Sequence, residues 1–154
     1  MREIVTTPDD PATAELLRAY FAERAAGFPG GGYRVASPDP AQFLPPGLFL
    51  RIDDADGVPL ACGGVRELAP ERGRRMEVKH LFVSPAGRGS GLGRRVLARL
   101  EAHAREQGVD WLVLDTNRSL VAAGGLYRSA GFEPGPAFND NPNATDWYAK
   151  RLVP

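Results

Sequence analysis

The sequence predicts an α+β domain built on one mixed sheet, and three observations support this prediction. The chain has 154 residues, the usual length of one domain, so we expect a single domain over residues 1–154. Hydrophobic residues make up 43% of the chain and charged residues 25%, a balance typical of a protein with a buried core. Segments that favour strands and helices follow one another as hairpin, strand, helix, strand, helix and terminal strands.

The first third of the chain predicts one strand, one helix and a long loop. A short strand is expected at residues 4–5, and apolar residues at helical spacing predict a helix over residues 11–26. Residues 27–47 are rich in glycine and proline, which long regular elements do not tolerate. A linker between two domains would have a similar composition, but the segment before it is too short to fold alone. We therefore expect a loop, with a short helical turn, that lies over a functional site.

The middle of the chain predicts three strands. Residues 48–52 and 60–65 favour strands, and the Asp-Gly step between them predicts an antiparallel hairpin. A charged segment over residues 66–75 separates this hairpin from a third strand. That strand covers residues 77–83, which are rich in β-branched and aromatic side chains.

A second helix and a parallel strand follow. Apolar residues repeat every fourth position from Leu92, until Gly108 ends the helix. Residues 111–114 then form a short apolar strand that we expect to be buried on both faces. Together with residues 77–83, this unit predicts a right-handed parallel crossover.

The last part of the chain predicts one more helix and two strands. Apolar residues mark one face of a helix over residues 120–127. Gly124 and Gly125 cost about 1 kcal/mol each inside a helix relative to Ala, so we expect something to approach the backbone closely there. A strand opens at Phe132, and residues 146–152 close the chain as a final strand. An edge strand pairs readily with a second chain, so we expect a monomer or a homodimer.

Charge and cysteine content exclude several classes of protein. The chain carries 19 Lys+Arg and 19 Asp+Glu, which argues against a nucleic-acid or membrane-surface protein, because both depend on a basic excess. Cys62 is the single cysteine, which excludes an intrachain disulfide and a cysteine-based zinc cluster. The chain has no apolar targeting segment at its start and no run of about 18 apolar residues that would span a membrane. We therefore expect a cytoplasmic protein without a metal.

A Gly-rich turn over residues 88–93 follows the strand of residues 77–83 and opens the second helix. Glycine lets consecutive backbone N–H groups point into one concavity, and a helix N-terminus adds about half a positive charge, so such a turn binds phosphate. The spacing of its glycines fits neither the dinucleotide fingerprint nor the P-loop. A purely structural Gly-rich connection is the alternative.

Two segments together resemble the acetyl-CoA-binding region of the GNAT superfamily of N-acetyltransferases. The first is the strand followed by Arg-x-x-Gly-x-Gly, which Arg88, Gly91 and Gly93 match. The second ends in Leu-Tyr-x-x-x-Gly-Phe, which residues 126–132 match. The resemblance implies an acetyl-CoA-dependent N-acetyltransferase with an α/β three-layer architecture. Its mixed, mostly antiparallel sheet would be flanked by helices and splayed between two central parallel strands.

The resemblance also implies where acetyl-CoA binds. Its pantetheine arm would lie in the gap between the two parallel strands, where it pairs with exposed backbone groups as an added strand would. Backbone amides of the Gly-rich turn would hold the pyrophosphate. The candidate cofactor-binding residues are Leu81, Phe82, Val83, Arg88, Gly89, Ser90, Gly91, Leu92, Gly93, Arg94, Asn117, Gly124 and Tyr127.

Acetyl transfer to an amine needs a neutral nucleophile, a polarised thioester carbonyl and a proton for the departing thiolate. Tyr127 is the candidate proton donor, because the family motif has Tyr here and a phenol is protonated at pH 7; an ordinary core aromatic is the alternative. Glu77, beside the gap, is the candidate base, and an ordinary charge at a sheet end is the alternative. His80 is a further candidate base, with a packed polar residue as the alternative; it would lie on the face opposite Glu77 in a regular strand, and a bulge would change this. Cys62 is expected in the core, because direct transfer needs no acyl-enzyme.

The expected acceptor is a primary amine of a small molecule. Its selection should depend on residues 27–47, 66–75 and 134–146, which lie outside the matched motifs. Within them, three arginines could meet a carboxylate and two aspartates an ammonium: Arg72, Arg74, Arg75, Asp140 and Asp146. Two other function classes stay open, an acyl-CoA-binding module without catalysis and an RNA-binding protein that uses the arginines.

Overall fold

One mixed sheet runs through the part of the chain that this computed structural model describes, residues 1–153. In this part the sheet has seven strands in the order β1-β2-β3-β4-β5-β7-β6, with β4 and β5 as a parallel pair. The elements are β1 (Arg2–Thr6), α1 (Pro11–Ala26), η1 (Pro40–Phe43), β2 (Leu48–Asp53), β3 (Pro59–Leu68), β4 (Arg75–Val83), η2 (Pro85–Gly87), α2 (Leu92–Glu106), β5 (Trp111–Thr116), α3 (Val121–Ser129), β6 (Glu133–Gly135) and β7 (Asp146–Arg151). The predicted α+β fold on a mixed, mostly antiparallel sheet is confirmed.

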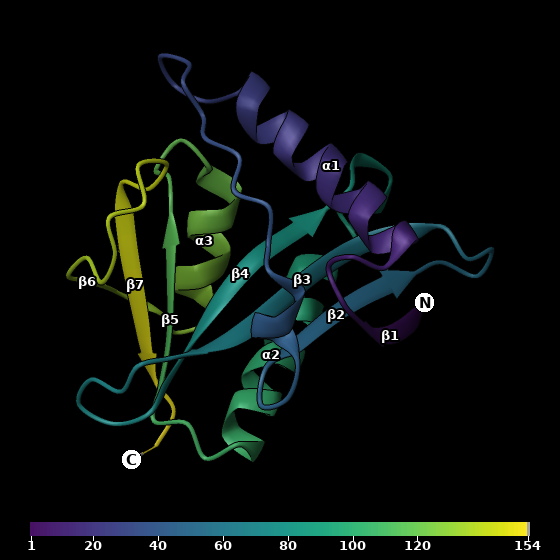
Figure 1. Cartoon of the computed structure of the whole chain (residues 1–154). Helices are drawn as coiled ribbons and strands as arrows, with labels where there is room; N and C mark the ends of the chain where they lie inside the picture. The colour runs from purple at the N-terminus through teal and green to yellow at the C-terminus, as the bar shows by residue number, and fades with distance from the viewer. Residues whose placement is uncertain (154) are drawn as a thin grey trace.

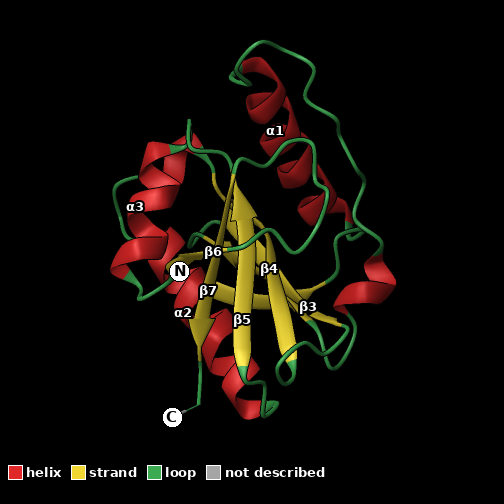
Figure 2. Cartoon of the chain, turned by 90° about the vertical axis from the view of Figure 1, so that its left-hand side faces the viewer, coloured by secondary structure: helices red, strands yellow, loops and turns green. Residues whose placement is uncertain are grey.

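The helices cover the two faces of the sheet, α1 on one face and α2 with α3 on the other (Figure 2). On the α1 face, Leu17 packs against Phe49 and Phe82. On the opposite face, Leu97 and Leu100 of α2 belong to a larger apolar cluster. The sheet is therefore the middle of three layers. Within residues 1–153, none of the helices is long and apolar enough to cross a membrane.

The two parallel strands pair over only part of their length. Residues 75–77 of β4 pair with residues 111–113 of β5, and the strands then diverge toward their C-terminal ends (Figure 1). Beyond that point β4 continues along β3, and β5 continues along β7. Backbone groups on the β5 side of residues 78–83 are therefore left without a neighbouring strand. The predicted splay of the sheet is confirmed.

A bulge in β4 changes which side chains reach the splayed region. In the β3–β4 ladder His80 and Leu81 together oppose the single residue Gly63. His80 has a φ of 57°, which is uncommon for a residue other than glycine. Its ring therefore lies on the α1 side, 5.6 Å from the ring of Phe21. The placement of His80 opposite Glu77, which holds only for a regular strand, does not apply here, because the bulge interrupts the alternation of the strand.

The start of α1 is anchored by a buried cluster of charges. Asp10 caps the helix by accepting a hydrogen bond from the backbone N–H of Thr13 at 3.1 Å. Arg51 of β2 donates to Asp10 at 2.6 Å and pairs with Asp53 at 2.8 Å. Because Arg51 and Asp53 are buried, separating these charges would be costly. The cluster holds α1 over the sheet and so positions the α1 residues that line the site.

Two expectations about the strands are corrected. The charged segment of residues 66–75 is not a separate excursion, since β3 continues to Leu68 and β4 begins at Arg75. The final strand is not an edge strand, because β7 pairs with both β5 and β6. The edges of the described sheet are β1 and the three-residue β6, which covers residues 147–149 of β7.

Candidate active site

A groove of about 560 Å³ opens where β4 separates from β5. Its walls come from the end of β4, the Gly-rich turn before α2, the start of α3 and the end of α1. Nine of the predicted cofactor-binding residues line it: Leu81, Phe82, Val83, Arg88, Gly89, Gly91, Leu92, Gly93 and Tyr127. The Gly-rich turn and the Leu-Tyr-x-x-x-Gly-Phe segment therefore line the same groove.

The Gly-rich turn leaves backbone amides available at one end of this groove. Gly89 and Gly91 have φ values of 85° and 77°, which favour glycine, and Gly91 is the N-cap of α2. Within the described residues, no side chain caps this end of the helix. Its first N–H groups lack intrahelical acceptors, and the helix dipole adds partial positive charge. These donors fit a pyrophosphate group.

Arg88 connects the turn to α1. Its Nη2 donates to both carboxylate oxygens of Glu23, at 2.6 and 2.7 Å, and its Nε donates to the carbonyl of Val83 at 3.2 Å. Arg88 and Glu23 both line the groove. The pair therefore joins α1 to the end of β4, and Glu23 offsets the charge of the guanidinium.

Four predicted cofactor-binding residues do not line the groove: Ser90, Arg94, Asn117 and Gly124. The hydroxyl of Ser90 donates to a backbone carbonyl of its own turn at 2.7 Å. Arg94 donates to the hydroxyl of Ser129 at 2.9 Å. Asn117 is buried and donates to the carbonyl of Asn143 at 3.2 Å. Asn117 therefore supports the loop between β6 and β7 rather than the groove.

The two glycines inside α3 do not mark a close approach of another part of the chain. A Cβ at Gly124 would meet only the flexible side chain of Arg128, at 3.2 Å. A Cβ at Gly125 would meet nothing within 4 Å. No other part of the described chain approaches these two glycines closely, and room for the cofactor beside Gly124 stays a prediction.

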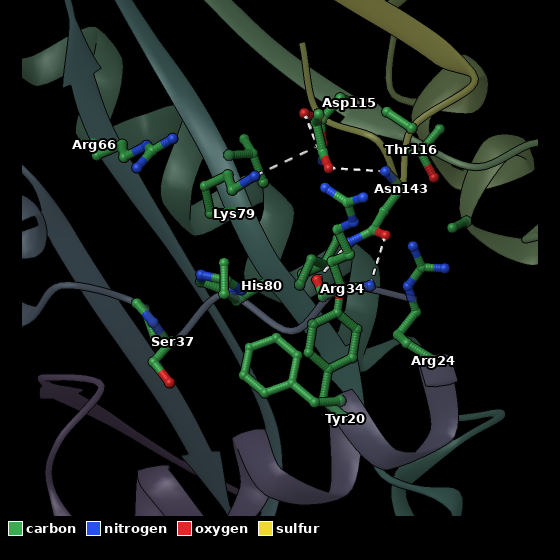
Figure 3. Close-up of a pocket in the computed structure, with 18 of the residues that line it drawn as sticks. Tyr20, Arg24, Arg34, Ser37, Arg66, Lys79, His80, Asp115, Thr116 and Asn143 are labelled. Atoms are coloured by element: carbon green, nitrogen blue, oxygen red, sulfur yellow. Dashed lines mark hydrogen bonds and ion pairs between the residues drawn. The ribbon is translucent and has the colours of Figure 1, made fainter. Parts of the chain in front are cut away.

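A second cavity, of about 360 Å³, adjoins the groove (Figure 3). Its lining comes from α1, the α1–β2 loop, β4, the end of β5 and the loop between β6 and β7. Six residues line both spaces: Tyr20, Arg24, Leu81, Leu120, Ala123 and Tyr127. The groove and the cavity therefore meet at these side chains.

Tyr127 lies at this junction with its ring in the core. The centre of its ring is 6.1 Å from that of Phe132 and 6.2 Å from that of Tyr148. Burial raises the pKa of Tyr127 well above its usual range, and the nearby Tyr20 and Asp115 raise it further. The phenol is therefore protonated at neutral pH. The ring packs in the core, which agrees with the interpretation of Tyr127 as a core aromatic. The residue also lines both the groove and the cavity, which is the position that a proton donor needs.

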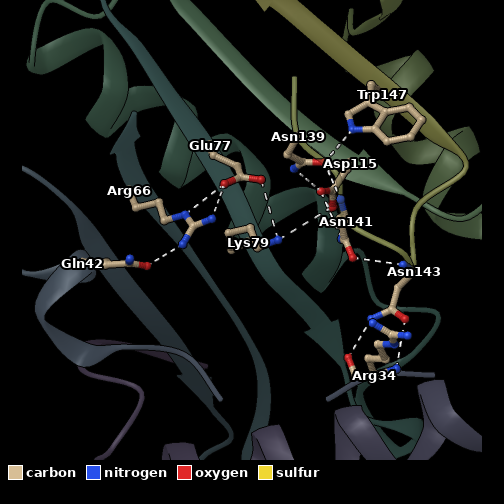
Figure 4. A network of polar contacts seen from close by, with 10 residues as sticks. All are labelled: Arg34, Gln42, Arg66, Glu77, Lys79, Asp115, Asn139, Asn141, Asn143 and Trp147. Atoms are coloured by element: carbon tan, nitrogen blue, oxygen red, sulfur yellow. Dashed lines mark hydrogen bonds and ion pairs between the residues drawn. The ribbon is translucent and has the colours of Figure 1, made fainter. Parts of the chain in front are cut away.

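A chain of charged groups extends from β3 to the end of β5 beside the cavity (Figure 4). Arg66 donates to one carboxylate oxygen of Glu77 at 2.9 Å. The Nζ atom of Lys79 lies 3.6 Å from the other oxygen of Glu77 and 3.7 Å from Asp115. Positive and negative groups therefore alternate along this network, with two of each sign.

Three asparagines at alternate positions of the loop between β6 and β7 extend this network, and two of them, Asn141 and Asn143, line the cavity. Asn139 and Asn141 donate to the carboxylate of Asp115 at 2.7 and 3.2 Å. Asn143 accepts from the backbone N–H of Arg34 at 3.0 Å and donates to its carbonyl at 2.7 Å. These two hydrogen bonds hold the α1–β2 loop over the cavity. The glycine- and proline-rich composition of residues 27–47 predicted a loop over a functional site.

Glu77 lies behind the lining of the cavity. Its side chain is 1% exposed, and Glu77 lines neither the cavity nor the groove. One of its oxygens is engaged by Arg66, and the other makes no hydrogen bond with a described residue. Asp115, in contrast, lines the cavity. The role of Glu77 as the base therefore stays a prediction.

His80 and Cys62 lie close together but do not have the reactivity of catalytic groups. Burial lowers the pKa of His80 to about 3, and the positive charges of Lys79 and Arg66 lower it as well. Burial raises the pKa of the Cys62 thiol to about 12. The His80 ring is thus neutral and weakly basic, and Cys62 is a core residue, as expected.

The charges expected to select the acceptor lie outside the cavity, namely Arg72, Arg74, Arg75, Asp140 and Asp146. Arg74 and Arg75 form ion pairs within the β3–β4 hairpin, and Asp146 pairs with Arg118 at 3.1 Å. The charged residues that do line the cavity are Arg24, Arg34, Asp39, Arg66, Lys79 and Asp115. Sequence reasoning missed most of them because they come from separate segments that only the folded sheet brings together. A local signal existed for Asp115, which directly follows three buried residues of β5.

Comparison with known proteins indicates the same family as the sequence motifs. Residues 12–132 match the sequence pattern of the Acetyltransferase (GNAT) family. The chain is 29% identical over 133 residues to the uncharacterized N-acetyltransferase YjgM of Escherichia coli, and the match covers 84% of this chain and 79% of that protein.

Two solved structures share the fold. A GNAT-family acetyltransferase from Staphylococcus aureus Mu50 has a TM-score of 0.82 at 18% identity, over 99% of this chain and 100% of that chain. A GNAT-superfamily phosphinothricin acetyltransferase from Sinorhizobium meliloti, solved in complex with acetyl-CoA, has a TM-score of 0.64 at 16% identity. The second similarity covers 99% of this chain and 89% of that chain.

Proposed function

This chain belongs to the acetyltransferase (GNAT) family, and we propose that it transfers the acetyl group of acetyl-CoA to the primary amine of a small molecule. The observation that carries this proposal is the meeting of a groove and a cavity at Tyr127. A donor in the groove and an acceptor in the cavity would have their reacting ends at this junction. That arrangement suits direct transfer in a ternary complex.

Two sets of backbone groups along the groove support acetyl-CoA as the donor. Backbone groups of residues 81–83, left unpaired by the splay, can bind the amides of the pantetheine arm as an added strand would. The amides at the start of α2 can bind the pyrophosphate. The similar protein from Sinorhizobium meliloti was solved with the same ligand, which supports this choice of donor.

Acetyl-CoA supplies an acetyl group activated as a thioester. A neutral amine in the cavity attacks this group, so that a C–N bond forms while the C–S bond breaks. Tyr127 donates its phenolic proton to the departing sulfur, since burial keeps the phenol protonated at neutral pH and so available as the acid. The attacking nitrogen, positively charged once the C–N bond has formed, loses its second proton to solvent, and a proton from solvent restores the phenol.

The acceptor must lose a proton before it can attack, because a primary amine is mostly an ammonium ion at neutral pH. Asp115 lines the cavity, so its carboxylate can attract the ammonium and take the proton directly. Glu77 is separated from Asp115 by Lys79 and is held by Arg66. We therefore assign Asp115 as the first proton acceptor and treat Glu77 as the competing candidate.

The direct experiment is to mix the purified chain with acetyl-CoA and a panel of primary amines, and to follow release of the CoA thiol. We expect at least one small amine to raise the rate clearly above that of hydrolysis without an acceptor, and mass spectrometry to find its acetylated product. Acetyl-CoA binding without release by any amine would point instead to a non-catalytic acyl-CoA-binding module. Salt-sensitive RNA binding with no acetyl-CoA binding would contradict the proposal as well.

A further inference from the structure

The cavity contains more positive than negative charge, and this excess bears on what the acceptor is. Its lining includes four cationic side chains and two carboxylates. The charges of Arg66 and Lys79 are balanced, because both side chains pair with Glu77 or Asp115 in the network beside the cavity. Two guanidinium groups, those of Arg24 and Arg34, remain outside that balanced network.

Neither guanidinium has a carboxylate partner. Among residues 1–153, no Asp or Glu oxygen lies within ion-pair distance of Arg24 or Arg34. The remaining cavity carboxylate, Asp39, accepts the backbone N–H of Ala41 at 3.0 Å at the start of η1. Neither arginine is therefore neutralised by an ion pair within the described residues.

Arg24 carries an unused hydrogen-bond donor. Its Nε–H is buried and makes no hydrogen bond within the described structure, whereas buried donors in native proteins are almost always paired. The guanidinium lies 5.0 Å from the ring centre of Tyr33, which holds it against the α1–β2 loop. Such a donor in the wall of a cavity favours an anionic ligand group.

Arg34 is positioned by its backbone. Both its backbone N–H and its carbonyl are bound by the side chain of Asn143, which fixes the backbone of this exposed residue at the lining of the cavity. Figure 3 shows Arg24, Arg34 and Asn143 near the end of β5 that carries Asp115. Two cations and one carboxylate are therefore gathered in one part of the lining.

We infer that the acceptor is a small amine that also carries an acid group, either a carboxylate as in an amino acid or a phosphate. Its ammonium would bind Asp115, and its acid group would bind Arg24 and Arg34. The cavity volume of about 360 Å³ suits a ligand of this size. This inference rests on the proposed acetyl transfer and names the substrate class of the same site.

The first experiment compares matched acceptors on the wild-type chain. Free amino acids are compared with their carboxamides, and aminoalkyl phosphates with the corresponding amino alcohols, so that each pair differs only in the acid group. We expect kcat/KM to be at least about tenfold higher for the acidic member of one pair, because hydrogen bonds to charged groups are the stronger ones. The pair that shows the difference identifies carboxylate or phosphate.

The second experiment tests Arg34, which lines the cavity but not the groove. Arg34→Gln should raise KM for the acidic acceptor at least about tenfold and leave KM for acetyl-CoA unchanged. Arg34→Lys should restore part of the loss. Arg118→Gln is the matched control, since Arg118 is exposed and lies outside both spaces.

The outcomes separate this inference from the proposed function. Efficient acetylation of neutral amines, with no preference for the acidic partners and no effect of Arg34→Gln, would overturn the inference and leave the acetyltransferase proposal intact. Absence of transfer to every amine would overturn both. If Arg34→Gln does not fold, the preference of the wild-type chain between matched acceptors decides alone.

Discussion

Three titratable side chains around the cavity have environments that assign them different tasks. Tyr127 is buried and keeps its proton, so it suits donation to a leaving group. Asp115 carries a carboxylate in the lining of the cavity, so it suits the binding of an ammonium. His80 is kept neutral among aromatic rings and suits neither task. Asp115 and Glu77 are the two carboxylates that could take the proton of the substrate ammonium.

Asp115→Asn and Glu77→Gln separate the two candidate bases. Asp115→Asn should lower kcat/KM for the acceptor by about 10²-fold across pH 6–9, the usual size of a lost acid–base contribution. Glu77→Gln should have a much smaller effect, because Glu77 does not line the cavity. The measurement is a pH profile of kcat/KM for each variant, with thermal unfolding as a check on folding.

The opposite pattern would identify Glu77 as the base. In that case Glu77→Gln would cause the larger loss, with the greatest effect at acidic pH, while Asp115→Asn would retain most of the activity.

His80 predicts a loss of stability in acid. The pKa of His80 in the folded chain is about 3, below the usual value of about 6.5. Between these two pH values the unfolded chain binds a proton at this residue and the folded chain does not. Stability from this group is therefore complete above pH 6.5 and falls as the pH drops toward 3, by about 2 kcal/mol at pH 5. Urea unfolding of the wild type and of His80→Asn, at pH 7.5 and 5, measures the difference.

The variant should lose less stability than the wild type between these two pH values. An equal loss in both proteins would show that His80 does not contribute to the acid sensitivity.

At the scale of elements, the site depends on two backbone irregularities. The bulge in β4 turns His80 to the α1 side and leaves Leu81 and the residues after it along the groove. The left-handed glycines before α2 expose the first amides of that helix. Local patterns predicted the second feature, because glycine spacing is visible in a sequence. They did not predict the first, because a positive φ at a histidine leaves no compositional signal.

Gly91→Ala tests the turn before α2. The φ of 77° at this position costs a residue with a Cβ about 1–2 kcal/mol, although the space around it is open. We expect a loss of stability of this size and a weaker affinity for CoA, because relief of the strain would move the amides of the turn. Calorimetric titration with CoA and thermal unfolding measure the two effects.

Gly125→Ala is the matched control for that variant. Gly125 lies inside α3, a Cβ there would meet nothing within 4 Å, and Ala favours a helix, so this variant should be slightly more stable and should bind CoA normally. If Gly91→Ala bound CoA as tightly as Gly125→Ala, the turn would have no part in anion binding.

At the scale of the whole molecule, the sequence predicts the fold better than the acceptor side. The helix over residues 11–26, the hairpin and the crossover each carry a local signal, and the structure has them at the expected places. The interior position of β7 was missed, because strand order depends on pairing between distant segments. The cavity was missed for the same reason: Arg24, Arg34 and Asp115 lie in different segments and meet only in the folded chain.

Replacement of Tyr127 by Phe tests the central assignment most directly, because it removes the phenolic oxygen and keeps the ring that packs on Phe132 and Tyr148. Acetyl-CoA affinity is measured by calorimetry, and turnover is measured with a confirmed amine acceptor. We predict unchanged affinity and a decrease in kcat of about 10²–10⁴-fold, the usual contribution of a positioned acid. Unchanged affinity with undiminished turnover would contradict the assignment of Tyr127 as the proton donor at the junction of the groove and the cavity.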